Sequence, residues 1–167
     1  MHWRTHQSLK GKLHPSHPDD LQVVVHEGGP RFTQQKPEAV WVTITSLGDG
    51  VFTGKVLNKP HQLASIQQHQ EIQFIVETGT EHPVMVTEKY LREKPNWRIG
   101  PCTKCGFAEL FDAPSDLIRV TFPNLPTDAQ LEGFTAFCPL CGGVQSVEAC
   151  APSGAAEGRA WWKFWSS

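Results

Sequence analysis

The sequence contains no run of about eighteen consecutive apolar residues, so it predicts no membrane-spanning helix. Its first six residues, Met-His-Trp-Arg-Thr-His, also lack the apolar stretch of a secretory signal. There is no excess of positive charge, because 15 Lys and Arg stand against 17 Asp and Glu, for a formal net charge of -2. No overall field therefore attracts nucleic acid or anionic lipid. Together these absences predict a soluble, cytoplasmic protein.

Catalytic signatures are missing as well. The chain has no Gly-x-Ser-x-Gly elbow, no phosphate-binding glycine loop, no His-Glu-x-x-His helix and no internal repeat. Its 167 residues correspond to one ordinary domain or two small ones. We therefore expect a non-enzymatic protein.

The spacing of the cysteines is the most informative pattern in the sequence. Four of the five cysteines fall in two Cys-x-x-Cys-Gly units, Cys102-Thr-Lys-Cys105-Gly106 and Cys138-Pro-Leu-Cys141-Gly142. Two thiolates at this spacing can bind one ion from a tight turn, and the glycine can adopt a positive φ that points backbone N–H groups at the sulfurs. Two such units supply the four soft ligands that a tetrahedral Zn²⁺ site requires. In a cytoplasmic protein this pattern favours a metal over disulfides.

The two units resemble those of a zinc ribbon. The resemblance implies one structural zinc ion bound by four ligands: Cys102, Cys105, Cys138 and Cys141. An iron site of the rubredoxin kind uses the same ligands, so the choice of zinc or iron stays open. The segment between the units is longer than a minimal ribbon needs, and it predicts a strand over residues 117–122, a short helix from Thr127 and a strand over residues 134–137. The remaining cysteine, Cys150, is expected to be a buried small residue.

Residues 21–96 predict a small β domain that precedes this zinc-ribbon module, which we place at residues 97–150. Short strands with period-two apolar patterns are expected over residues 21–26, 40–45, 51–57, 71–76 and 84–86. An Asp49-Gly50 step indicates a hairpin between two of them, and a short helix is expected over Glu88–Glu93. The predicted fold class is α+β, mainly β, with a small barrel-like domain followed by a long-insert zinc ribbon.

A second resemblance covers residues 38–80. The spacing Phe52-x-Gly54-x-Val56-x-Asn58-x-Pro60, followed by an Ile72-x-Phe74 strand, is similar to an uncharacterised bacterial family of small barrel domains. This resemblance implies a barrel fold and a bacterial protein. It implies no catalytic residues.

The two ends of the chain predict different behaviour from the middle. Residues 1–20 are rich in His without apolar periodicity, which predicts a mobile arm. Residues 151–167 form a linker and a Trp-rich tail, in which the predicted interaction residues are Trp161, Trp162, Phe164 and Trp165. The tail is either such an interaction element, a segment that folds back over its own domain, or a membrane-surface anchor.

These observations favour a protein-binding adaptor or inhibitor, of the immunity type for example, in a bacterial cytosol, with another protein as its partner. One alternative is a zinc-dependent nucleobase deaminase, because His69-Gln-Glu71 and Pro101-Cys102-x-x-Cys105 fit the His-x-Glu … Pro-Cys-x-x-Cys signature of that class. There His69, Cys102 and Cys105 would bind zinc and Glu71 would transfer the proton. Another alternative is a nucleic-acid-associated ribbon. It is disfavoured because acidic residues outnumber basic ones over residues 97–150.

Overall fold

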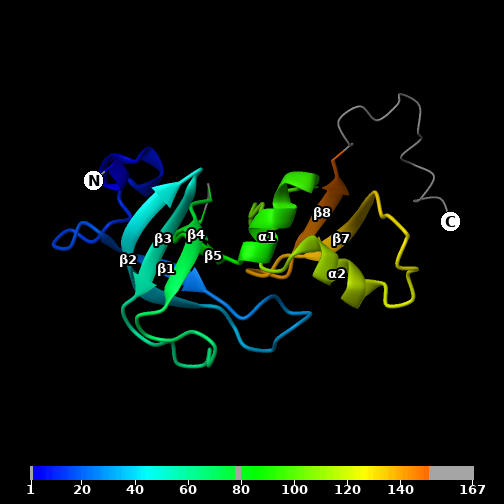
Figure 1. Cartoon of the computed structure of the whole chain (residues 1–167), viewed down its shortest axis with the longest axis horizontal. Helices are drawn as coiled ribbons and strands as arrows, with labels where there is room; N and C mark the ends of the chain where they lie inside the picture. The colour runs from blue at the N-terminus through cyan, green and yellow to red at the C-terminus, as the bar shows by residue number, and fades with distance from the viewer. Residues whose placement is uncertain (1, 78–79, 151–167) are drawn as a thin grey trace. The chain divides into compact units, whose positions relative to one another are not determined.

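In the computed structural model, which describes residues 2–77 and 80–150, the chain forms two units (Figure 1). The first runs from Met1 to Glu88 and the second from Lys89 to Ser167. The division falls within the short helix α1 (Glu88–Glu93), since Glu88 ends the first unit and Lys89 begins the second. The reason is that the polar side chains of α1 bind residues of the second unit, as described below.

The first unit is a closed barrel of five strands: β1 (Asp20–Val25), β2 (Glu38–Gly48), β3 (Val51–Val56), β4 (Glu71–Ile75) and β5 (Val84–Val86). Consecutive strands pair antiparallel, and β5 closes the barrel by pairing in parallel with β1. Side chains alternate between buried and accessible along β1 to β3, as the period of two requires. The prediction of a mainly β fold with a small barrel is confirmed.

The β2–β3 hairpin forms where the sequence predicts it. Asp49 and Gly50 both have positive φ, 52° and 76°, the backbone that a tight two-residue hairpin turn needs. Farther along the hairpin, β2 and β3 approach closely at Gly54. A Cβ at this position would lie 2.5 Å from Val42 Cγ1 and 2.7 Å from the Thr43 carbonyl oxygen. Only glycine fits there, which gives a physical reason for the Phe52-x-Gly54 pattern.

The N-terminal segment corrects the prediction of a mobile arm for residues 2–20. It forms two 3₁₀ turns, η1 (His2–Thr5) and η2 (Gln7–Leu9), whose Trp3 and Leu9 side chains are buried in the barrel core. The Asp19 carboxylate accepts hydrogen bonds from Trp3 Nε1 and Arg4 Nε, both at 2.8 Å. Two isolated apolar residues produce no periodic pattern, so the sequence alone does not predict that this segment packs on the barrel.

The second unit contains a three-stranded antiparallel sheet in the order β6 (Trp97–Ile99), β8 (Val144–Ala149) and β7 (Gly133–Phe137). The turn η3 (Lys94–Asn96) joins α1 to β6, and α2 (Pro114–Thr121) lies between β6 and β7. The predicted helix over Glu88–Glu93 and the predicted strand over 134–137 are confirmed.

Two predictions for the long segment between the cysteine pairs are wrong. Residues 117–122 were expected to form a strand, but most of them belong to α2. Pro114 at the first helical position and Asp116 in the first turn outweigh the β-branched residues that follow. The helix expected from Thr127 is only a turn, so its capping-box pattern does not start a helix.

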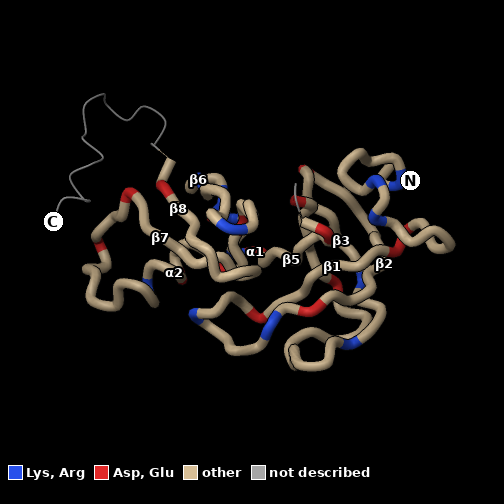
Figure 2. Tube along the Cα trace, turned by 180° about the vertical axis from the view of Figure 1, so that it is seen from behind, with Lys and Arg blue, Asp and Glu red and all other residues tan. Residues whose placement is uncertain are grey.

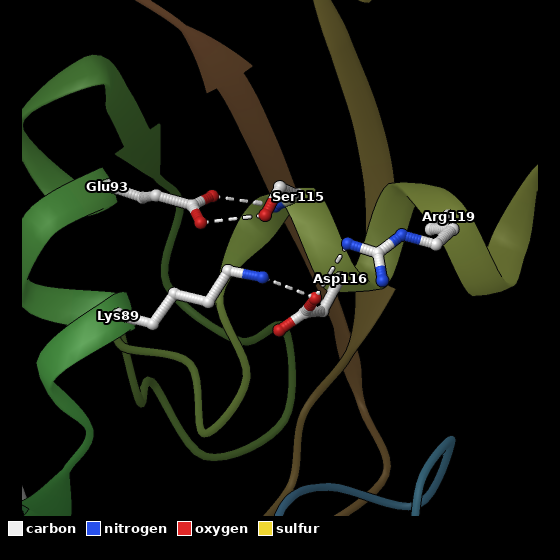
Figure 3. Close-up of polar contacts among 5 residues, drawn as sticks. All are labelled: Lys89, Glu93, Ser115, Asp116 and Arg119. Carbon is white, nitrogen blue, oxygen red and sulfur yellow. Dashed lines mark hydrogen bonds and ion pairs between the residues drawn. The ribbon is translucent and has the colours of Figure 1, made fainter. Parts of the chain in front are cut away.

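Helix α1 holds the beginning of α2 through its side chains (Figure 3). The N-cap residue of α2, Ala113, has no side-chain acceptor, and Glu93 of α1 supplies one. Its carboxylate accepts hydrogen bonds from the Ser115 backbone N–H at 2.8 Å and from the Ser115 hydroxyl at 2.7 Å. Lys89 lies 2.6 Å from the Asp116 carboxylate, which also binds Arg119 at 3.1 Å. These contacts explain why most of α1 belongs to the second unit.

Candidate metal centre

The four paired cysteines come together in the second unit. Cys102 and Cys105 form the first knuckle, in the loop after β6, and Cys138 and Cys141 form the second knuckle, between β7 and β8. All four sulfur atoms lie within 4.8 Å of one another. The sequence-based choice of these four residues as a metal-binding set is supported by this cluster. Cys102 and Cys138 are buried, whereas Cys105 and Cys141 are exposed.

Each knuckle is a tight turn closed by its glycine. The N–H of Gly106 donates to the Cys102 carbonyl at 3.0 Å, and that of Gly142 donates to the Cys138 carbonyl at 2.9 Å. Both glycines have the expected positive φ, 81° and 78°. Backbone N–H groups also point at sulfur, from Lys104 to Cys102 Sγ at 3.3 Å and from Gly143 to Cys141 Sγ at 3.4 Å. The glycine turns of the two knuckles are therefore alike, whereas the N–H contacts with sulfur involve the first cysteine of one pair and the second cysteine of the other.

Backbone contacts hold the two knuckles against each other. The Thr103 N–H donates to the Val144 carbonyl at 3.0 Å, and the Val144 N–H donates to the Thr103 hydroxyl at 3.3 Å. Gly143 makes the close approach feasible, because a Cβ there would lie 2.5 Å from Cys102 Sγ and 3.1 Å from the Lys104 Cβ. No local pattern singles out Gly143, since its role depends on a residue some forty positions away.

The sulfur–sulfur distances fit a shared ion rather than disulfides. Cys102 Sγ lies 3.4 Å from Cys141 Sγ, and Cys105 Sγ lies 3.6 Å from Cys138 Sγ. A disulfide bond is about 2.05 Å long. A tetrahedral ion with metal–sulfur bonds of about 2.3 Å separates its ligands by about 3.8 Å. Both close contacts join one knuckle to the other, so an ion at the centre would bridge them.

The thiol pKa values show why four such groups need a cation. Burial raises the pKa of the Cys138 thiol to about 12. Burial also acts to raise the pKa of Cys102, but the backbone N–H groups of Cys105 and Lys104 outweigh it and lower this pKa to about 6. Four neighbouring sulfurs cannot all ionise without a compensating charge. A divalent ion supplies that charge, and its binding would release thiol protons.

A buried polar network fixes the chain segment that follows the first knuckle. Gln145 of β8 is fully buried, and its Nε2 donates to the carbonyl oxygens of Phe107 at 2.8 Å and Glu109 at 3.1 Å. The Glu109 carboxylate is buried too, accepting hydrogen bonds from the Tyr90 hydroxyl and from Lys94 Nζ. These contacts support a structural role for Glu109. Tyr90, Lys94 and Gln145 could not be found from the sequence, since no motif connects them.

The residues of the deaminase hypothesis are divided between the two units. His69 lies in a loop of the first unit with a φ of 69°, and Glu71 is an exposed residue at the start of β4. Within the described ranges, the sulfur cluster consists of the four cysteines and does not include His69.

Three large apolar side chains are exposed around the second knuckle. Phe137 at the end of β7 and Val144 at the start of β8 are opposite each other in the sheet, with 51% and 42% of their surface exposed. Leu140, in the turn between the two cysteines, is 38% exposed. We call these three side chains the knuckle surface. Phe137 and Val144 are neighbours on one face of the hairpin.

Of the basic side chains described between residues 89 and 150, four form ion pairs. Lys94 binds Glu109, Arg98 binds Glu148, and Lys89 and Arg119 both bind Asp116. Acidic and basic positions are interspersed along the trace of the second unit (Figure 2). A nucleic-acid interface needs cations that are available to phosphates. The ion pairs therefore disfavour the nucleic-acid alternative.

Two sequence predictions concern the end of the chain. Cys150 is exposed, which corrects the expectation that it is buried, although its backbone N–H donates to the Asn96 carbonyl at 2.8 Å. The predicted interaction residues Trp161, Trp162, Phe164 and Trp165 lie outside the described residues.

Comparisons with known proteins add no relative. No family model matches the chain, and neither the curated proteins nor the solved structures include a match. Among the described residues, no helix is both long enough and apolar enough to cross a membrane.

Proposed function

We propose that the four cysteines bind one structural zinc ion and that the chain acts by binding another protein rather than by catalysis. The observation that carries this proposal is the mutual approach of four sulfurs, one pair from each knuckle, within 4.8 Å. Tetrahedral thiolate sites of this kind favour zinc, with iron as the second choice. Four protein ligands leave no coordination position for water or substrate. This argues against the deaminase, whose zinc needs an open position.

The ion would stabilise the part of the second unit where the two knuckles meet, beside the buried side chains of Phe107, Phe134 and Val147. The sheet of this unit has three short strands, and both knuckles depend on a few backbone hydrogen bonds. Structural zinc contributes on the order of 10 kcal/mol to the folding of small zinc-binding peptides. The ion therefore acts by fixing the position of the second knuckle, where the apolar side chains of the knuckle surface are exposed.

The knuckle surface supports binding to a protein. Exposed aliphatic and aromatic side chains that gather at one place are typical of protein interaction sites. The ion pairs of the same unit disfavour a phosphate-bearing partner. An adaptor and an inhibitor, including one of the immunity type, both fit this description, and we place either in a bacterial cytoplasm.

The test is a pull-down experiment with the zinc-loaded full chain as bait. A Phe137→Ser variant is the second bait, and a Phe32→Ser variant is the control. Phe32 is an exposed phenylalanine of the first unit and matches Phe137 in exposure, at 46% against 51%. A protein that the wild-type and control baits retain, and that the Phe137→Ser bait loses, supports the proposal. Equal retention by all three baits would contradict the proposal that the knuckle surface binds the partner.

A further inference from the structure

The knuckle surface lies at the start of β8, and the described chain ends at Cys150, just beyond the other end of this strand. We propose that residues 161–165 of the same chain dock on the knuckle surface. The proposal does not depend on an external partner. It deepens the proposed function in one respect, because a protein that binds the knuckle surface would have to displace the tail.

The exposed face of the hairpin has an apolar end and a polar end. Phe137 and Val144 are opposite each other beside the knuckle, and the next pair on the same face, Thr135 and Ser146, is exposed and polar. Because alternate residues of a strand share a face, a docked segment would find apolar contacts only at the knuckle end. Leu140, in the turn between Cys138 and Cys141, is exposed as well.

The tail has the aromatic composition expected of a segment that binds a small apolar surface. Four of the five residues in Trp161-Trp162-Lys163-Phe164-Trp165 are large aromatics. Each aromatic side chain can bury roughly 150–250 Å² with few rotatable bonds, which makes it effective against a small apolar patch. The tail also has Arg159 and Lys163 next to these aromatics, which provides a way to test whether it is covered.

The length of the intervening chain favours docking within one molecule. Along β8, the distance from Cys150 back to Val144 is about 20 Å at the usual rise of a strand. From Cys150 to Trp161 there are eleven residue steps. A coil of that length has an end-to-end distance of roughly 18 Å and a maximum of about 40 Å. Because the typical span equals the distance to be covered, the effective concentration of the tail is close to its maximum. A second copy of the chain at micromolar concentration cannot compete with it.

Docking is expected to depend on the metal site. Leu140 lies between the ligands Cys138 and Cys141, so its position follows that of the sulfurs. Val144 is bonded to Thr103 of the first knuckle. Metal removal would therefore separate the three apolar side chains and release the tail.

Limited digestion of the zinc-loaded full chain with trypsin tests the proposal, with mass spectrometry to follow cleavage after Arg159 and Lys163. Cleavage of a covered segment follows the fraction of molecules in which it is open. If the tail is docked in about nine molecules of ten, only about one tenth of the molecules can be cleaved at a given time. Phe137→Ser should leave nearly all molecules open and so increase the cleavage rate about tenfold. Phe32→Ser, the matched control in the other unit, should leave the rate unchanged.

A tail variant completes the test without altering the sheet. Replacing Trp161, Trp162 and Trp165 with Ser should increase cleavage after Arg159 as much as Phe137→Ser does, and combining the two changes should add nothing. Cleavage of Phe137→Ser at the wild-type rate would overturn the proposal. So would a wild-type rate that falls as the protein concentration rises, since that result means docking on a second copy.

Discussion

Gly143, which follows the second knuckle, lies against the sulfur of Cys102 in the first: a Cβ at position 143 would be 2.5 Å from Cys102 Sγ. The same Cβ would be 3.1 Å from the Lys104 Cβ. Two turns from distant parts of the sequence can share one ion only if their backbones come this close. Gly143 is therefore the position at which the two halves of the metal site fit together.

Gly143→Ala should lower the affinity for zinc by at least about tenfold, a loss typical of changes next to metal ligands. The added methyl group must displace either the Cys102 sulfur or the first knuckle. Competition with a chelating dye measures the affinity. Gly48→Ala is the matched control, because position 48 is open and has no positive φ. An unchanged affinity for Gly143→Ala would contradict the close approach.

Gly54→Ala should destabilise the first unit by about 1–3 kcal/mol. The new Cβ would collide with the Thr43 carbonyl oxygen at 2.7 Å, and this oxygen belongs to the backbone of β2 and cannot turn away. Denaturant unfolding, followed by NMR signals of the barrel, gives the change in free energy. Gly48→Ala in the same strand pair should cost much less, and an equal cost would argue against the steric explanation.

The buried imidazole of His26 makes the stability of the barrel depend on pH. Burial lowers the pKa of His26 from 6.5 to about 4, although a hydrogen bond with the Met85 carbonyl at 2.9 Å opposes the shift. Between these pH values the unfolded chain binds a proton that the folded chain does not. The free energy of unfolding should therefore be complete above pH 6.5 and fall by about 3 kcal/mol as the pH drops toward 4.

Barrel NMR signals in urea at several pH values give this profile without a contribution from the metal site. His26→Gln, which cannot titrate, should be less stable at neutral pH but should lose the slope between pH 6.5 and 4. A slope that persists in the variant would assign the effect to other groups. Asp19 acts at lower pH, since hydrogen bonds from Arg4 and Trp3 lower its pKa to about 2.

Removal of the metal should unfold the second unit and leave the barrel folded. A chelator would remove the ion that we propose between the knuckles, whereas the five strands of the first unit form their own closed core. In a ¹H–¹⁵N spectrum, signals of residues 97–149 should collapse to unfolded positions while those of the barrel persist. Cys138→Ser should have the same effect without a chelator. A well-dispersed second unit after chelation would mean that the ion is not structural.

Much of the fold was predictable because its signals are local. The Asp49-Gly50 turn, the alternating strands of the barrel and the two knuckles are all encoded within a few neighbouring residues. The prediction of α1 over Glu88–Glu93 is confirmed for the same reason. The long segment between the cysteine pairs was less predictable, because the β-branched residues of α2 resemble a strand when its helix start is overlooked.

The remaining features depend on contacts between distant residues. Trp3 is buried because it packs in the barrel and donates a hydrogen bond to Asp19. Gly143 is required because Cys102 Sγ lies where a Cβ would be. Glu109 is buried with Tyr90 and Lys94 as partners. A single sequence contains no record of such pairings, so they require the structure.

X-ray absorption of the metal in the purified full chain, combined with metal stoichiometry, identifies the atoms that bind the ion. We expect one zinc ion per chain with four sulfur neighbours at about 2.3 Å. A shell of two sulfurs with nitrogen or oxygen neighbours would contradict this expectation, because an open site of that kind belongs to a catalyst. Glu71→Ala would then be the first variant to assay for deaminase activity.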